Sequence, residues 1–291
     1  MAQVLEHRNR LRLIIETILF CGRQNIPLRG HRNDGKLTIR EKPLINEGNF
    51  RALLTFRATA GNETLKKHLE NTFSRATYIS KTTQNEIIEC CKEEIQNHIL
   101  ARVKKVRAYS ILFDETTDVA HIEQISLSLR YIHEENIRED FLTFADIYDS
   151  IREEDIKKNK RRFTGVALGH CMVDLLKKFE LSLKNCVGIG TDNCSVMASD
   201  LKGAVQEIIK SCPNAKRCTC FNHFLNNSLA KTAKVISTRN AIDTMKSVIR
   251  FSNASFKRTS VFKKHIGGSF SGFCETRWIE KHDSILQFED S

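Results

Sequence analysis

The chain has 291 residues, 41% of them hydrophobic, which is enough for the core of one large domain or two ordinary ones. Lys and Arg exceed Asp and Glu by eleven, and this positive charge should attract polyanions, above all nucleic acid. The alternative is a basic surface that is simply solvated. The ten cysteines are thinly spread and no secretory leader is visible, which predicts free thiols in a reducing compartment. The apolar run 11–20 contains charged residues and is too short to span a bilayer, so no membrane role is expected.

Residues 1 to about 100 are predicted to be helical. Two segments, 7–26 and 82–103, carry apolar residues at helical spacing. Polar, glycine-punctuated stretches at 29–37 and 46–62 separate them. We interpret this region as a helical leader that precedes a different kind of domain.

From Tyr109 the apolar period changes from helical spacing to two. A first strand is expected at 109–113, and the alternation in 124–132 predicts a second strand that is buried on one face only. A third apolar segment, 139–148, completes an antiparallel meander. A polar, basic loop at 152–162 then leads to a helix with its apolar residues on one side: Leu168, Met172, Leu175 and Phe179.

The second half of this domain repeats the alternation of strands and helices. A short strand is expected within 181–190, with Asp192 just past its end, and a helix follows around 204–212. The segment 215–220 fits a fifth strand, and a helix begins near His223. The basic tract 231–265 is predicted to be further helix. The order of elements therefore predicts an α/β domain with five strands.

Asp114 and Asp192 each follow the end of a predicted strand. Ligands in open α/β sheets gather at such strand ends, so the two carboxylates can meet if their strands are neighbours. Paired carboxylates suit Mg²⁺ or Mn²⁺, which activate water and stabilise the oxygens of a phosphodiester during cleavage. The same residues fit an alternative in which Asp114, Asp118 and Asp192 cap turns and hold no metal.

Four ordered motifs carry a family resemblance: "ILFDETTD", "VGIGTDNCSVMAS", "CFNHFLNNSLA" and "CETRWIEKHDSI". Together they resemble the hAT superfamily of DNA transposases. The preceding "IPLRGHRNDG", "GNFRALLTFRA" and "YISKTTQNEIIECC" resemble the leader of the subgroup known as domain of unknown function 4371. The resemblance thus covers nearly the whole chain.

This resemblance implies an RNase H-like mixed five-stranded sheet with flanking helices, which cuts DNA through a metal-bound triad of two Asp and one Glu. Asp114 matches the first acid and Asp192 the second, both as ligands of Mg²⁺ or Mn²⁺. No residue up to Ser291 matches the third acid, which in the family follows a large helical insertion. Glu275, Glu280 and Glu289 lie too early to serve, so the resemblance implies an incomplete catalytic core and leaves enzymatic activity open.

Cys220 and His223 match the Cys-x-x-His motif of the family, which implies a structural or target-handling role close to the acids. Cys212, Cys218, Cys220 and His223 include enough sulfur and nitrogen ligands for zinc, but their spacing is not that of a zinc finger or knuckle. Zinc is therefore not expected, and buried structural roles are the alternative.

Arg277 and Trp278 match the family's Arg-Trp pair and are implied to bind DNA. The indole ring of a Trp can stack on a base that is turned out of the duplex, and the guanidinium of an Arg can donate two hydrogen bonds to a phosphate. Without the resemblance, the single Trp of the chain is interpreted as core filler.

The resemblance implies three parts, a helical leader (1–105), an RNase H-like core (106–234) and the start of a helical insertion (235–291). The implied ancestral function is Mg²⁺-dependent DNA cleavage and strand transfer in the nucleus, for which the basic run 157–162 is a candidate import signal. The rival hypothesis is a domesticated, inactive nuclear regulator that keeps DNA or protein contacts. DNA is the expected partner, and homo-oligomers are expected to form through segments outside this chain.

Overall fold

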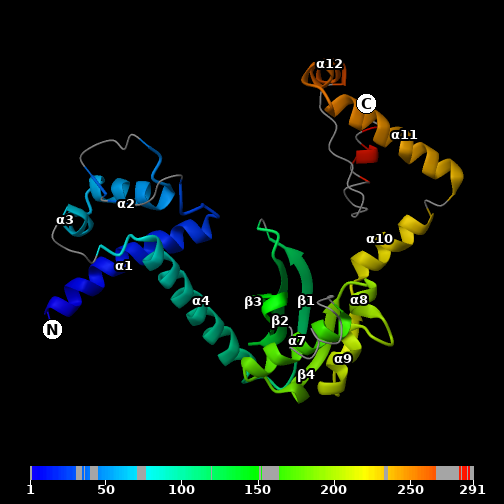
Figure 1. Ribbon diagram of the computed structural model, residues 1–291, viewed down its shortest axis with the longest axis horizontal. Helices are drawn as coiled ribbons and strands as arrows, with labels where there is room; N and C mark the ends of the chain where they lie inside the picture. The colour runs from blue at the N-terminus through cyan, green and yellow to red at the C-terminus, as the bar shows by residue number, and fades with distance from the viewer. Residues whose placement is uncertain are drawn as a thin grey trace. The chain divides into compact units, whose positions relative to one another are not determined.

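The computed structural model divides the chain into two compact units, Met1–Ile99 and Leu100–Ser291 (Figure 1). The expected divisions at 105/106 and 234/235 stay predictions. None of the described helices is both long enough and apolar enough to cross a membrane. The structure describes residues 2–30, 35, 37–39, 45–70, 77–118, 120–150, 152, 164–232, 235–266, 282, 284–286 and 288.

The first unit is helical, as the periodicity predicted. Its helices are α1 (Ala2–Arg23), α2 (Asn49–Thr59), α3 (Glu63–Glu70) and the start of α4 (Lys81–Val103). One hydrophobic core joins them, and its members are Ile14, Ile18, Leu37, Phe50, Leu54, Ala58, Leu65, Leu69, Ile79 and Ile87. Ile14 and Ile18 are four residues apart, so they point to the same side of α1.

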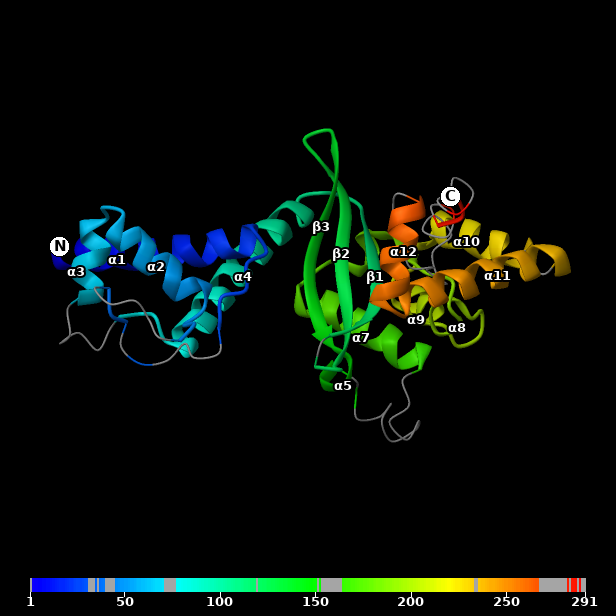
Figure 2. The same cartoon turned by 90° about the horizontal axis from the view of Figure 1, so that it is seen from above.

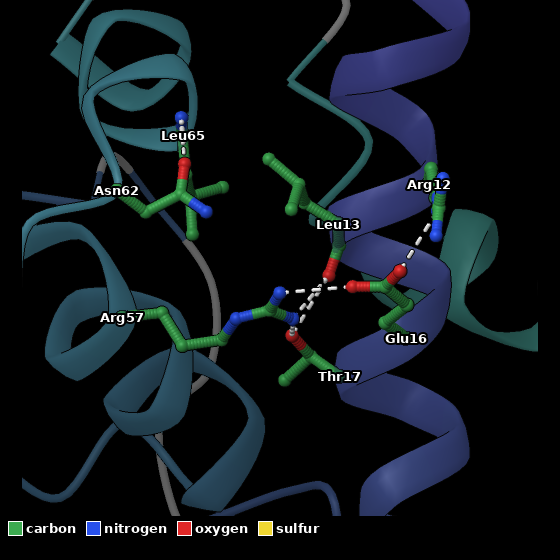
Figure 3. Close-up of polar contacts among 7 residues, drawn as sticks. All are labelled: Arg12, Leu13, Glu16, Thr17, Arg57, Asn62 and Leu65. Carbon is green, nitrogen blue, oxygen red and sulfur yellow. Dashed lines mark hydrogen bonds and ion pairs between the residues drawn. The ribbon is translucent and has the colours of Figure 1, made fainter.

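Arg57 links α2 to α1 through three hydrogen bonds (Figure 3). Its Nη1 donates to the Leu13 carbonyl and to Thr17 Oγ1, both at 2.8 Å, and its Nη2 donates to Glu16 Oε2 at 3.0 Å. The Arg57 hydrogen bond, followed by that of Arg12, holds the pKa of Glu16 below its ordinary value. The guanidinium therefore satisfies a backbone carbonyl, a hydroxyl and a carboxylate at one helix contact.

Replacing Arg57 by methionine is expected to lower the free energy of unfolding of the first unit by about 2 kcal/mol. Methionine keeps an apolar stem but leaves the buried Thr17 hydroxyl and the Glu16 carboxylate without their charged donor. Urea denaturation measures the change. Arg12→Met is the control, because the Arg12 side chain is 77% exposed and also pairs with Glu16. Equal effects of the two variants would contradict the role of Arg57.

The second unit contains a mixed five-stranded sheet with the order β3-β2-β1-β4-β5, as expected for an RNase-like domain. The strands are β1 (Tyr109–Thr117), β2 (Glu123–His133), β3 (Asn136–Asp146), β4 (Cys186–Thr191) and β5 (Lys216–Thr219). Strands β1, β2 and β3 form the antiparallel meander seen side by side in Figure 2. Strands β4 and β5 join it in parallel, next to β1.

Strand β1 is longer than expected, because it continues to Thr117 and not only to residue 113. Its pairing with β2 runs without a break to Thr117 opposite Glu123. Asp114 therefore lies inside the strand, opposite Ser126, and not just beyond its end. The sequence suggested an earlier end because its acidic residues are uncommon in strands, but the ladder with β2 supplies the backbone hydrogen bonds.

The sheet buries one face more than the other. Ile111 and Phe113 of β1 are buried, as are Ile125, Leu127, Leu129 and Tyr131 of β2. Side chains alternate along a strand, so Leu112 and Asp114 lie on the other face of β1. On that other face, Asp114 of β1 lies opposite Ser126 of β2, which lies opposite Phe144 of β3. Phe144 is 53% exposed. Asp114 thus lies on the less buried face.

Helices follow the strands in the expected order. They are α5 (Ile147–Ser150), α7 (Gly165–Lys178), α8 (Ser195–Ala198) and α9 (Ala204–Ser211), with a 3₁₀ turn at Leu183–Asn185. Helix α7 begins at an N-cap, Thr164, whose hydroxyl accepts a hydrogen bond from the Ala167 amide at 3.2 Å. It buries Leu168, Met172 and Leu176 and lies beside α9, where His170 and Glu207 interact at 3.1 Å (Figure 1).

The helical tract after β5 is divided into three helices: α10 (Phe221–Thr232), α11 (Ile236–Asn253) and α12 (Phe256–Ile266). The expected helix across 231–265 is therefore interrupted. At the corner between α11 and α12, Thr259 Oγ1 donates to the Ser252 carbonyl at 3.0 Å, and Arg258 Nη1 donates to the Phe251 carbonyl at 3.1 Å. These side-chain hydrogen bonds satisfy carbonyls that the interruption leaves without helical partners.

Candidate functional site

The carboxyl ends of β1, β4 and β5 meet at one edge of the sheet, because the three strands are parallel neighbours. Leu112 of β1 pairs with Gly190 of β4, and Asp192 directly follows the end of β4 at Thr191. Asp192 is close enough to Asp114 for its charge to act on that carboxylate. The structure thus brings the two expected acids to the same edge of the sheet.

The hydrogen bonds of the acids leave part of each carboxylate for other partners. Asp114 Oδ1 accepts from the amide of Glu115 at 3.0 Å, and Asp192 Oδ1 accepts from the amide of Cys194 at 3.1 Å. The second contact is an Asx-type turn, as the capping alternative requires. Asp118 caps a turn more fully, since its Oδ1 accepts from Ala120 and Ile122 at 2.8 and 2.9 Å. Turn capping therefore accounts for the position of Asp118. In Asp114 and Asp192, the hydrogen bonds to backbone amides use only one carboxylate oxygen of each residue.

Arg217 of β5 steadies the loop that carries the second acid. Its Nη2 donates to Asn193 Oδ1 at 2.5 Å, and Asn193 directly follows Asp192. The Nε of Arg217 is buried and has no hydrogen-bond partner among the described residues. The sequence did not single out this contact, because it joins residues 24 positions apart in different elements. A cation thus lies one residue from the acid pair and fixes its loop.

Burial and neighbouring negative charges raise the pKa of two acids at this edge, Asp114 and Glu115. Burial and then the charge of Asp192 raise the pKa of Asp114, while the charge of His223 lowers it. Burial, followed by the charges of Asp192, Glu123 and Asp114, raises the pKa of Glu115 to about 7. Glu115 was not identified from the sequence. The sequence shows only that Glu115 lies between Asp114 and two threonines. That position does not reveal how close Asp192 is in the folded chain.

Between pH 5 and 7 in metal-free buffer, the stability of the second unit is expected to fall. The folded pKa of Glu115 is about 7 against an ordinary 4.5, so the native state binds more protons than the unfolded state in this window, and unfolding becomes easier as pH rises. Glu115→Gln should remove about 1 kcal/mol of that fall, a value discounted for solvent screening. Urea denaturation at both pH values in EDTA measures it. Glu139→Gln is the control, and an unchanged pH dependence in Glu115→Gln would contradict the assignment.

Cys220 and His223 lie at the same edge. Cys220 directly follows β5, and its carbonyl accepts a hydrogen bond from the Phe224 amide at 3.0 Å, so it starts α10. His223 is in the first turn of α10 and is close enough to act on the pKa of Asp114. Their expected role near the acids stays a prediction.

The remaining candidates lie elsewhere or outside the described residues. Cys212 is fully buried at the end of α9, where its thiol hydrogen-bonds with Cys186, while Cys218 and Cys220 are exposed. Arg277 and Trp278 lie outside the described residues, as do the basic run 157–162 and Glu275, Glu280 and Glu289. Their expected roles are neither supported nor contradicted.

The donor set at the sheet edge fits part of a magnesium site. Asp114 and Asp192 are neighbouring carboxylates whose mutual repulsion a divalent cation would remove. The described residues contain no group of three or more His, Cys, Asp or Glu side chains placed to hold a metal ion. These two acids would therefore supply two protein ligands, and the other positions would be filled by water or by phosphate oxygens.

Comparison with known proteins supports the fold. The family model of the ZMYM1/FAM200 RNase-like domain, DUF4371, matches residues 2–203. The human protein named "52 kDa repressor of the inhibitor of the protein kinase" is 28% identical over 293 aligned residues, which cover 96% of this chain and 36% of that protein. The mouse protein of the same name is 27% identical over the same shares. The chain therefore spans about a third of the length of these curated relatives.

Proposed function

The chain belongs to the family of ZMYM1/FAM200 RNase-like domains, which derive from hAT transposases, and we propose that its paired aspartates hold a divalent cation against the backbone of bound DNA. The observation that carries this proposal is the parallel pairing of β1 with β4, which brings Asp114 and the loop after β4 to one edge of the sheet, close enough for the charge of Asp192 to act on Asp114. The net charge of +11 supports a polyanionic partner.

Each residue at the edge has a distinct role in this proposal. Asp114 and Asp192 bind the cation with carboxylate oxygens, Arg217 fixes the loop after β4 through Asn193, and His223 favours the ionised form of Asp114. When bound, Mg²⁺ or Mn²⁺ supplies charge stabilisation for the attacking and leaving oxygens of a phosphodiester. No residue of this chain is assigned as the third acid of the triad.

A titration with MnCl₂ tests the proposal directly. We expect weak binding to the chain alone, because two protein carboxylates supply few ligands, and tighter binding in the presence of duplex DNA, whose phosphate oxygens complete the coordination. Isothermal titration calorimetry measures both affinities. Mn²⁺ binding that duplex DNA leaves unchanged would contradict a site facing the DNA backbone.

A second candidate function is favoured by the relatives. Two curated relatives bear the word "repressor" in their names, which supports a regulator. The second candidate is therefore a domesticated, catalytically inactive nuclear regulator that keeps DNA or protein contacts. Full-length protein that binds duplex DNA but leaves supercoiled plasmid intact with Mg²⁺ or Mn²⁺ would support the regulator. Nicking of the plasmid would support the enzyme. DNA is the partner of the first candidate, and DNA or protein is the partner of the second.

A further inference from the structure

Positive charge is concentrated in the last two described helices. Residues 235–266 contain seven Lys or Arg and one Asp, a net charge of +6 out of +11 for the whole chain. Helix α12 alone carries four Lys or Arg and no Asp or Glu. All four of its cationic side chains are exposed: Lys257, Arg258, Lys263 and Lys264. The acids that would neutralise this charge are therefore not within the helix itself.

The corner between α11 and α12 fixes one of these cations, Arg258. Arg258 Nη1 donates to the Phe251 carbonyl, and the guanidinium carbon lies 4.0 Å from the centre of the Phe251 ring. Thr259 Oγ1 donates to the carbonyl of Ser252, which is 1% exposed. These contacts hold the first turn of α12 against the end of α11. The remaining cations of α12, Lys257, Lys263 and Lys264, are exposed.

Lys257 and Lys264 share one side of α12. They are seven residues apart, which returns to nearly the same direction after two turns, about 10.5 Å further along the axis. The exposed apolar residues Phe256 and Val261 are five residues apart and point about 140° from each other. They do not form the separate apolar face that binding to a membrane surface needs. Lys263 points about 100° away from Lys264, so the cations and the apolar residues alternate around the exposed surface of α12.

Helix stability does not explain the position of all these cations. Lys263 and Lys264 in the last turn complement the helix dipole, but Lys257 and Arg258 lie in the first turn, where a positive charge is unfavourable. Arg258 has its contacts with Phe251 in return. Lys257 has no acid to pair with inside α12, because that helix contains no Asp or Glu. A polyanion bound along α12 would account for Lys257.

We propose that α12 binds the phosphodiester backbone of duplex DNA through Lys257, Lys263 and Lys264, without recognising a sequence. The inference rests on the proposed function, in which DNA is the partner, and it identifies α12 as a surface that binds the DNA. Contacts of Lys with phosphates release counterions, so each contact adds about 0.9 to the slope of log affinity against log salt. The surface lies apart in sequence from the expected DNA contacts Arg277 and Trp278.

Fluorescence anisotropy with a labelled 20-base-pair duplex of arbitrary sequence, between 50 and 200 mM KCl, tests the proposal on the whole chain. Lys263→Gln/Lys264→Gln is expected to bind about tenfold more weakly at 100 mM salt and to lower the salt slope by about 1.8. The matched control is Lys177→Gln/Lys178→Gln, which removes two exposed lysines from the last turn of α7. It should leave the slope nearly unchanged.

A third variant separates a lost contact from a lost fold. Lys257→Gln removes an unfavourable first-turn charge, so α12 should be at least as stable, yet the salt slope should fall by about 0.9. Two results would overturn the assignment of α12 but leave DNA binding by the chain intact. One is an equal change of the salt slope in the α12 and α7 double variants, and the other is an unchanged slope in Lys257→Gln. Absence of binding by the unaltered chain at 50 mM KCl would overturn the proposed function as well. Stronger binding to phosphatidylserine vesicles than to DNA would also overturn the inference.

Discussion

Asp114→Asn and Asp192→Asn are each expected to abolish Mn²⁺ binding by this chain and to reduce Mg²⁺-dependent nicking by an active full-length protein at least about 100-fold. A cation that stabilises the oxygens of a phosphodiester contributes several kcal/mol, and each 1.36 kcal/mol corresponds to about a tenfold change in rate. Asparagine keeps the size of the side chain but removes the charge. Both variants should therefore fold.

Calorimetry with MnCl₂ measures the first effect, and conversion of supercoiled plasmid to open circles measures the second. Asp200→Asn is the matched control, since Asp200 is exposed in the turn after α8, eight positions beyond Asp192. A variant of Asp114 or Asp192 that binds Mn²⁺ as the unaltered chain does would remove that residue from the site. If the full-length protein does not nick, the calorimetric result still decides the metal site.

Gly165→Ala is expected to destabilise the second unit by about 3 kcal/mol. A Cβ at this first residue of α7 would lie 2.3 Å from the Val196 carbonyl oxygen, 2.4 Å from that of Lys202 and 2.8 Å from the amide nitrogen of Ala204. All three are backbone atoms, which cannot rotate away, so α7 or the segment 196–204 must shift. That segment follows Asp192, so the shift should also weaken Mn²⁺ binding.

Gly22→Ala provides the matched control for Gly165→Ala. Gly22 lies within α1, and a Cβ there would meet no atom within 4 Å. Alanine in a helix is favoured over glycine by up to about 1 kcal/mol, so the control should stabilise the protein slightly. Urea denaturation of both variants measures the difference. A Gly165→Ala protein as stable as the unaltered chain would contradict the close packing of α7 against 196–204.

The elements of this fold could be predicted from hydrophobic periodicity. The alternation of Ile125, Leu127 and Leu129 with Ser126 and Ser128 gave a strand buried on one face, and the structure confirms it. Element ends were less predictable. Strand β1 extends past Asp114 because β2 offers it a hydrogen-bonding partner, and the tract 231–265 breaks at the corner held by Thr259. Both depend on contacts with another segment.

The candidate site was predictable only in part. Asp114 and Asp192 could be chosen because each stands where an apolar strand meets polar residues, and the motifs added the expected pairing. The elevated pKa of Glu115 and the hold of Arg217 on Asn193 had no such signal. The elevated pKa arises from burial and then from the charges of Asp192, Glu123 and Asp114, two of which lie outside β1. The Arg217 contact joins β5 to the loop after β4.

The sequence by itself determined which segments form strands and helices, because periodicity depends only on which residues are apolar. It also determined the positive charge and the positions of the two acids. The tertiary structure decided the strand order that makes β1 and β4 parallel neighbours, and hence that Asp114 and Asp192 come to the same edge of the sheet. Strand order depends on how distant segments pack together, and no local pattern in the chain specifies that packing.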